Sequence, residues 1–319
     1  SMDRATRAAL TRTGLAHVIS VSGFHVAVAA GAFFFLVRWL ALRIGGLALH
    51  VDVAKLAALA GLLPVGVYAA IAGDSVPAAR SFLMYGVLLG ALLCDRPPDG
   101  FRALAAAAVL LAIPAPDIAA DVSFELSFVS VAALILVARG RGPREAAAWS
   151  SVDAPVAPVA LRAGAGRRAW WQRYIVQPPV GSVAATGATA PLTAWHFQQV
   201  SLIAPLANLI ALPLLGPATL LPGLAALPLV VPAPGWADAL LAVAGWAAGL
   251  GLALSVWLAR LPWAAIATPM PSLLELALCY AALALWWFGP AARVAAPGRN
   301  GRSPHRIAIV VVAVLALTD

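Results

Sequence analysis

The sequence predicts an all-α, polytopic transmembrane protein of about ten spans, some of them broken or re-entrant helices. Hydrophobic residues make up 62% of the chain and charged residues 11%, and the mean hydropathy is +0.92. Soluble domains are about 45–50% apolar and about 25% charged. Apolar segments recur as far as the C-terminus, so a signal peptide does not explain this composition.

Apolar segments follow one another along the chain, and a span needs about 20 mostly apolar residues. Two of the segments, 101–113 and 122–137, are shorter than this. In chain order, we expect the spans near residues 15–42, 53–71, 76–93, 101–113, 122–137, 178–195, 202–231, 237–258, 272–288 and 307–319. The last segment is cut short and the chain begins abruptly, so we expect the sequence to be a fragment.

Arginine placement predicts the orientation of these spans. Arginines follow the first and third spans, and seven lie in the segment 139–173 after the fifth, at positions 139, 141, 144, 162, 167, 168 and 173. The positive-inside rule then makes 139–173 a cytoplasmic loop and places the N-terminus outside. This basic loop could anchor the topology or contact a polyanion.

A polar cluster opens the first expected span. It contains His17, Ser20, Ser22, Gly23 and His25. Polar groups in hydrocarbon are costly, and such clusters therefore indicate a functional site. His17 with Ser20 and Ser22 with His25 form i,i+3 pairs, but Ser20 and Ser22 lie about 200° apart around an ideal helix. We therefore expect a channel-lining or broken helix at Gly23, with helix–helix contacts through Ser and His as the alternative.

Arg80 lies one turn inside the third expected span. Pro77 suits the first helical turn, with Ser75 or Asp74 as the cap. An arginine at this depth needs a partner such as Asp74 or water. It could bind a phosphate group, or its side chain could extend to the membrane interface.

Glu125 and Ser127 lie in the fifth expected span, in the stretch Ser123-Phe124-Glu125-Leu126-Ser127-Phe128. No basic residue is close to Glu125 in the sequence. Its carboxyl group must pair across helices, become protonated or contact water, and the sequence leaves these routes open.

The seventh expected span is interrupted by proline. His196 ends the preceding segment, and seven prolines fall from Ser201 to Pro234. Proline removes a helical hydrogen bond and frees a carbonyl, so this stretch predicts a broken or re-entrant helix. Asn208, one turn before Pro213, could bridge the freed backbone groups or contact a substrate.

The charged and cysteine residues exclude several functions. Twenty arginines and one lysine give a net charge of +8, which suits anionic lipid, nucleic acid or membrane topology alike. Lys55 is followed by Leu56, so there is no Gly-Lys-Ser/Thr phosphate loop and the chain is not itself a P-loop motor. Cys94 and Cys279 form no zinc-binding spacing, and we expect neither a metal nor a cofactor.

Several short motifs, in order, resemble the ComEC family, bacterial channel proteins that import DNA during natural transformation. The resemblance covers nearly the whole chain, although Glu125 stands where the family commonly has Gln. The matching pieces are Gly14-Leu15-Ala16-His17, Ser22-Gly23-Phe24-His25, Ala79-Arg80-Ser81, Leu126-Ser127-Phe128 and residues 191–213.

The resemblance implies that residues 1–319 are the competence domain of an inner-membrane channel that passes one DNA strand into the cytoplasm. The expected partners are single-stranded DNA, membrane lipids, flanking OB-like and metallo-β-lactamase-like domains, a cytoplasmic helicase-like ATPase and a DNA-receptor protein. The chain has no His-x-His-x-Asp-His motif, so we expect no nuclease and no other enzyme here.

The resemblance also gives the candidate residues above a common task, which is to line an electropositive path with weak, sequence-independent contacts. Phe124, Trp195 and Phe197 could stack on bases or simply pack. Arg80 is the best candidate at the outer end.

Two other functions remain open from the residues alone. A secondary transporter for a small solute fits the proline-broken helices, with Glu125 or Glu275 as the coupling group. An intramembrane serine protease would pair Ser22 with His17, His25 or His196, but the context is Ser20-Val21-Ser22-Gly23 rather than Gly-x-Ser-Gly.

Overall fold

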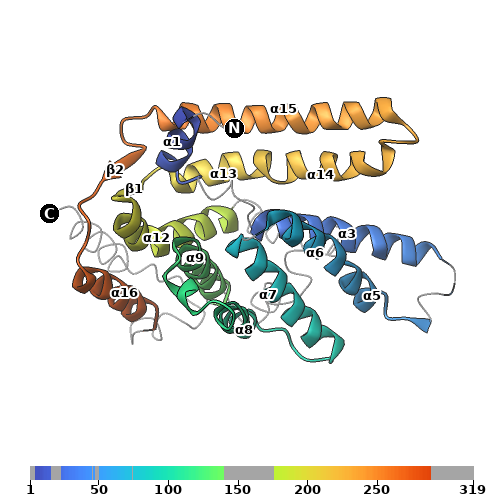
Figure 1. Ribbon diagram of the computed structural model, residues 1–319, viewed down its shortest axis with the longest axis horizontal. Coiled ribbons are helices and arrows are strands. Elements are labelled where there is room, and N and C mark those ends of the chain that lie inside the picture. The colour runs from blue at the N-terminus through green and yellow to red at the C-terminus, as the bar shows by residue number, and fades with distance from the viewer. Residues whose placement is uncertain are drawn as a thin grey trace.

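The computed structural model describes residues 4–15, 23–44, 46, 50–73, 75–139 and 176–288. Helices dominate these residues (Figure 1). In chain order, the elements are α1 (Arg4–Arg12), α3 (Gly23–Arg43), α5 (Val53–Ala60), α6 (Leu62–Ala72), α7 (Val76–Leu93), α8 (Gly100–Ala112), η1 (Pro116–Ala120), α9 (Val122–Arg139), α12 (Gln177–Phe197), β1 (Gln199–Ser201), α13 (Ala204–Leu215), α14 (Pro217–Ala226), η4 (Leu227–Leu229), α15 (Pro234–Ala259), β2 (Ala265–Ala267) and α16 (Leu273–Phe288).

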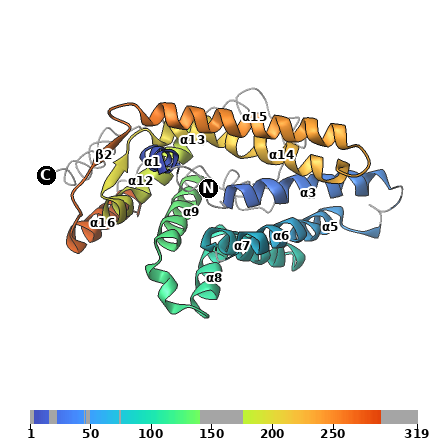
Figure 2. The same cartoon turned by 45° about the horizontal axis from the view of Figure 1, so that its top comes forward.

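The long helices form two neighbouring groups. α15 lies along α13 and α14, and α3 lies beside α14 with α5, α6 and α7 on its other side (Figures 1 and 2). α9 packs mainly against α12, which also contacts α13 and α16, while α7 contacts both α8 and α9. α9 therefore packs against both α7 and α12, which are far apart in the sequence.

The helical, membrane-spanning fold class is confirmed. Within the described residues, five helical stretches are long and apolar enough to cross a membrane: Phe24–Arg43, Val53–Ala70, Val76–Leu93, Ala204–Leu229 and Pro234–Ala259. Shorter apolar helices cover Gly100–Ala112, Val122–Ala138 and Leu273–Leu285. The number of about ten spans stays a prediction, and the segment 307–319 lies outside the described residues.

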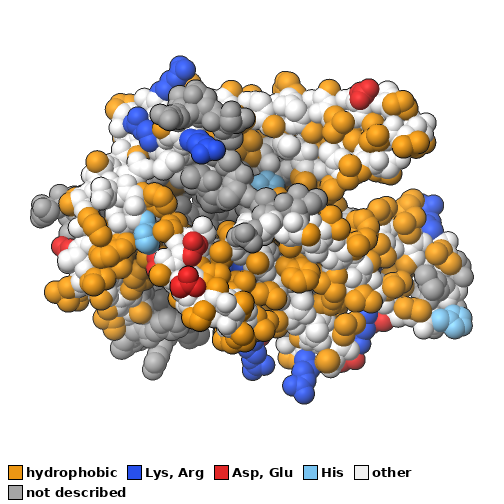
Figure 3. Space-filling view, viewed as in Figure 1, with side chains coloured by type: hydrophobic (Ala, Val, Ile, Leu, Met, Phe, Trp, Pro, Cys, Tyr) orange, Lys and Arg blue, Asp and Glu red, His pale blue; other side chains and the backbone are white. Residues whose placement is uncertain are grey.

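Hydrophobic side chains are spread over the whole visible face, and charged side chains are few (Figure 3). On α15, Trp236 is 73% exposed, Trp246 69% and Trp257 59%. A water-soluble protein rarely exposes so many large apolar side chains. In a bilayer, the same surface contacts lipid.

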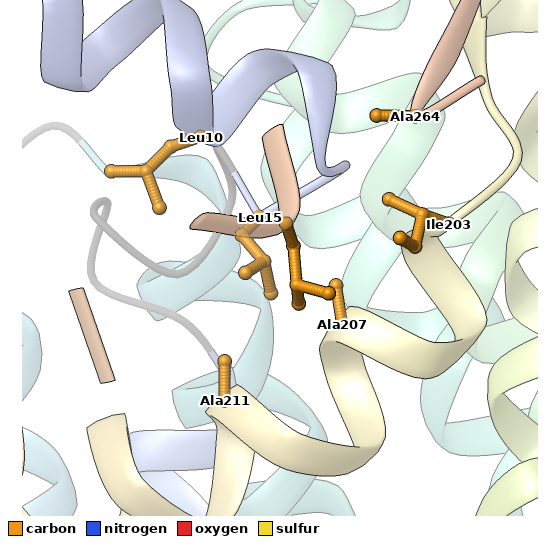
Figure 4. Close-up of a cluster of buried hydrophobic side chains, with 7 residues drawn as sticks. Leu10, Leu15, Ile203, Ala207, Ala211 and Ala264 are labelled. Atoms are coloured by element: carbon orange, nitrogen blue, oxygen red, sulfur yellow. The ribbon is translucent and has the colours of Figure 1, made fainter. Parts of the chain in front are cut away.

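The N-terminal segment differs from the prediction. α1 is an additional helix, and Leu15 follows it in irregular structure instead of starting the first span. Leu10 and Leu15 are fully buried in a cluster whose other members come from α13, α15 and the segment before β2 (Figure 4). These other members are Ile203, Ala207, Ala211, Leu258 and Ala264.

Gly14 permits this close docking of α1. Its φ angle is +71°, a conformation that glycine adopts without steric cost. A Cβ atom on Gly14 would lie 2.6 Å from the Cβ atom of Ala204 at the start of α13. The first and last of the sequence motifs therefore meet in the fold.

Two three-residue strands were not expected. β1 and β2 pair antiparallel, with Val200 opposite Ile266. They join the segment after α12 to the segment after α15. Alternation over three residues is too short to identify a strand from sequence.

Candidate functional site

Arg80 projects from the first turns of α7 into the protein. Ser75 occupies the N-cap position and Pro77 the first turn, as predicted, although the Ser75 side chain makes no capping hydrogen bond. Arg80 is only 6% exposed. The alternative in which its side chain extends to the membrane interface is therefore wrong, because the side chain turns towards α9.

The Arg80 guanidinium contacts α9 through one carbonyl and one aromatic ring. Nη1 donates to the backbone oxygen of Ser127 at 2.6 Å, and Cζ lies 5.9 Å from the ring centroid of Phe128. Nε is buried and has no hydrogen-bond partner, and no carboxylate pairs with Arg80 within the described residues. Its positive charge is therefore not neutralised by the part of the protein described here.

Glu125 and His196 join α9 to α12. Glu125 Oε2 and His196 Nε2 are 2.7 Å apart, and the side chains are 29% and 19% exposed. Of the routes left open for Glu125, the structure has the pairing across helices. A carboxylate oxygen accepts, so Nε2 carries the proton in this contact.

A shallow pocket of about 390 Å³ lies against this pair. Phe124 and Phe128 line it with their rings stacked, with centroids 4.2 Å apart and planes at 24°. The other lining residues are Ala119, Glu125, Val129, Leu192 and Tyr280. Phe128 thus lies between the pocket and the Arg80 guanidinium, and we call this group of side chains the α7–α9–α12 site.

The second polar region is the break between α13 and α14, where the proline pattern predicted an interrupted helix. Pro213 lies inside α13. The helix is interrupted at Gly216, and α14 begins at Pro217. Thr219 Oγ1 donates to Leu214 O at 2.7 Å, and His25 Nε2 donates to Leu215 O at 3.1 Å. Because water is absent from hydrocarbon, each freed carbonyl needs such a partner.

Asn208 does not bridge the freed backbone, so that interpretation is wrong. Its Nδ2 donates to Ser182 Oγ on α12 at 3.3 Å, and Ser182 Oγ donates to Pro205 O at 3.3 Å. The Asn208 Oδ1 atom is buried without a partner. Asn208 therefore joins α13 to α12 and lies about two helical turns before the break at Gly216.

The candidate residues thus fall into separate places. The α7–α9–α12 site contains Arg80, Glu125, Ser127 and His196, whereas His25, Asn208 and Pro213 belong to α13 and its neighbours. Gly23 is the first residue of α3. His17, Ser20, Ser22, Asp74 and residues 140–173 lie outside the described residues.

Three residues at these places were not among the site residues predicted from the sequence. Phe128 and Tyr280 line the pocket, and Thr219 supports the helix break. Tyr280 was detectable as a lone hydroxyl in an apolar helix, and its Oη donates to Ala188 O on α12 at 3.1 Å. Within the described residues, no group of three or more His, Cys, Asp and Glu side chains could hold a metal ion.

The fold and site define a class of protein: a multi-pass α-helical membrane protein with a buried arginine between its helices that pairs with no carboxylate among the described residues. A family model described as "Competence protein" matches residues 1–293, which is most of the chain. The chain belongs to this family of competence proteins, and its role is in competence, the uptake of DNA. This match confirms the resemblance to the ComEC family.

No curated protein and no solved structure matches the chain. The roles of individual residues therefore rest on the geometry described above.

Proposed function

We propose that this chain forms a channel that passes single-stranded DNA across the bacterial inner membrane during natural transformation. The observation that carries the proposal is Arg80, a buried cation without a carboxylate partner among the described residues of a competence-family membrane protein. Buried charges are normally paired. A phosphate of the passing strand supplies the missing negative charge.

The aromatic side chains beside Arg80 support the same function. Proteins that bind single strands without sequence preference combine positive charge with aromatic rings. Phe128 lies next to Arg80 and stacks on Phe124. Contact with one arginine and two aromatic rings is weak enough to let a DNA strand move on, as translocation requires.

The proposal assigns no catalytic step to this chain. The N-terminus lies outside, the 139–173 loop is cytoplasmic, and OB-like and metallo-β-lactamase-like domains flank the channel on the outer side. A helicase-like ATPase in the cytoplasm, with a DNA-receptor protein on the outer surface, completes the uptake system. The distribution of arginines along the sequence supports the proposed orientation of the loop and the N-terminus.

DNase-resistant uptake of labelled DNA tests the function. Cells deleted for the gene receive the full-length wild-type gene, Arg80→Ala or the matched control Arg102→Ala, whose side chain is exposed on α8. We expect deletion to abolish uptake while surface DNA binding persists. A hydrogen bond to a charged group contributes about 1.5–3 kcal/mol, so Arg80→Ala should reduce uptake roughly 10- to 100-fold at normal protein level. Unchanged uptake on deletion, with no paralogue present, would refute the channel.

A secondary transporter for a small solute is the second candidate. The Glu125–His196 pair beside the pocket favours it, because titratable pairs inside a membrane mark proton and ion pathways in such proteins. Proton-coupled solute uptake that Glu125→Gln abolishes, with DNA uptake unaffected by deletion, would establish this function instead.

A further inference from the structure

We propose that the pocket beside Arg80 holds one base of the translocating strand against Phe124 and Phe128, while Arg80 holds an adjacent phosphate. This inference rests on the proposed strand-translocating function and adds a separate subsite for the base. A nucleotide has an anionic part and a flat aromatic part, and the α7–α9–α12 site offers a counterpart to each.

The two phenylalanine rings provide the stacking surface. They lie one helical turn apart on α9, with centroids 4.2 Å apart and planes only 24° from parallel. Both rings line the pocket and neither is buried. Since every base has a π face, such a surface accepts all four bases, as transport of arbitrary DNA requires.

Arg80 lies close to Phe128, which also lines the pocket. Its Cζ atom is 5.9 Å from the Phe128 centroid, and Nη1 is fixed by the Ser127 carbonyl at 2.6 Å. The guanidinium has further donors, including the unpartnered Nε. A phosphate near Arg80 therefore leaves the attached base within reach of the rings.

Glu125 decides which part of the nucleotide enters the pocket. Its carboxylate lies in the pocket wall and is held by His196 at 2.7 Å. A carboxylate repels a phosphate but accepts hydrogen bonds from the N–H groups of bases, which all four bases have. The pocket volume of about 390 Å³ is at the small end of the about 300–1,000 Å³ usual for ligand pockets, which suits one base.

Abasic DNA separates the two subsites. The full chain, reconstituted in lipid nanodiscs, is titrated with fluorescent oligo-dT and with an abasic oligonucleotide of the same length and charge. The variants are Phe124→Leu/Phe128→Leu, Arg80→Met and the control Phe35→Leu, which changes a half-buried ring on α3. We expect wild type to bind oligo-dT about tenfold more tightly than abasic DNA, within the range that stacking of one base contributes.

The phenylalanine double variant should remove this preference and leave abasic binding unchanged, whereas Arg80→Met should weaken both oligonucleotides. Phe35→Leu should change neither. If wild type binds both oligonucleotides equally and the double variant changes nothing, the base subsite is refuted while the channel stands. If wild type binds neither oligonucleotide, the proposed function itself fails.

Cross-linking of wild type keeps the inference testable if the double variant does not fold. Oligonucleotides with 5-iodouracil are irradiated in the presence of the reconstituted chain, and the cross-linked peptides are identified. We expect cross-links at Phe124, Phe128 or Tyr280. Cross-links only elsewhere, or labelling of the pocket by a photoreactive phospholipid tail in preference to the oligonucleotide, would overturn the base subsite.

Discussion

The α13–α14 break and the α7–α9–α12 site both place polar side chains among apolar helices, but they use these side chains differently. At the break, His25 and Thr219 each donate to a carbonyl in the last turn of α13, next to the interruption at Gly216. At the α7–α9–α12 site, Arg80 keeps an unpartnered Nε, and the Glu125–His196 pair borders a pocket. The polar side chains at the break supply hydrogen bonds to backbone carbonyls. Those at the α7–α9–α12 site still have donors and acceptors with which they could bind a ligand.

This difference separates residues whose loss should lower stability from residues whose loss should lower uptake. Buried carbonyls without a donor cost free energy wherever they occur, and more so where no water can reach them. A cation without a counter-ion costs free energy as long as it stays unpaired. Substitutions at the break should therefore lower mainly stability, whereas substitution of Arg80 should lower mainly DNA uptake.

Gly216→Ala should give the largest loss of stability. A Cβ atom here would overlap the Phe24 ring and lie 2.8 Å from Leu212 O, so α3 could no longer approach the break. Overpacking of this kind costs about 1–3 kcal/mol, and we expect a value near the upper end. Thermal unfolding in detergent measures the effect.

Gly223→Ala is the matched control for this substitution, because the position lies in α14 and a Cβ atom there meets nothing within 4 Å. It should be neutral or slightly stabilising, since alanine favours helix more than glycine. If both variants behave alike, the close contact of Phe24 with Gly216 does not hold the break together.

His25→Leu should have the next largest effect, about 1–3 kcal/mol, because Leu215 O loses the donor that it has in the structure. His25→Gln, which retains an N–H donor, should recover part of this loss. The same unfolding measurement applies. Equal stability of the Leu and Gln variants would show that His25 contributes by volume alone.

The sequence predicted the helical class well, since apolar segments mark most of the observed helices and prolines mark the break. It could not divide the polar residues between the two regions. Glu125 and His196 are 71 positions apart, and nothing local pairs them. The short distance between Asn208 and Pro213 along the chain suggested that Asn208 bridges freed backbone groups. Its side chain instead contacts Ser182 on α12.

The N-terminal motif shows the same limit. Gly14 and Leu15 read as the beginning of an apolar span, but they pack on α13 and the cluster around Ile203. Periodicity and hydropathy indicate that a residue is buried, but they do not show which element of the protein it packs against. Partners far apart in sequence are therefore the part of this fold that sequence reasoning could not supply.

Arg80→Met should reduce uptake strongly and yet change stability by less than about 1 kcal/mol. Ser127 O also accepts from Ser130 Oγ at 2.9 Å, so losing Arg80 leaves that carbonyl with a donor. Removing an unpaired cation from a low-dielectric interior also relieves its desolvation cost, which offsets the lost hydrogen bond. Unfolding temperature and DNA uptake are measured on the same preparations. A large loss of stability would place Arg80 with the structural residues of the break.

Glu125→Gln should have the smallest effect on stability, about 0.5 kcal/mol or less. The amide oxygen of glutamine can still accept from His196 Nε2, so the connection between α9 and α12 persists with a neutral acceptor. Charge-assisted hydrogen bonds are about twice as strong as neutral ones, and partial exposure of both side chains weakens the difference.

Glu125→Leu is the informative comparison, because it removes the acceptor and should cost about 1–3 kcal/mol by leaving His196 without that partner. The free energies of unfolding of the two variants decide between charge and hydrogen bonding. If Glu125→Gln is as damaging as Glu125→Leu, the negative charge itself holds α9 to α12. The pair would then belong with His25 and Thr219 among the groups that maintain the fold, and the contrast between the two regions would rest on Arg80 and the phenylalanine rings.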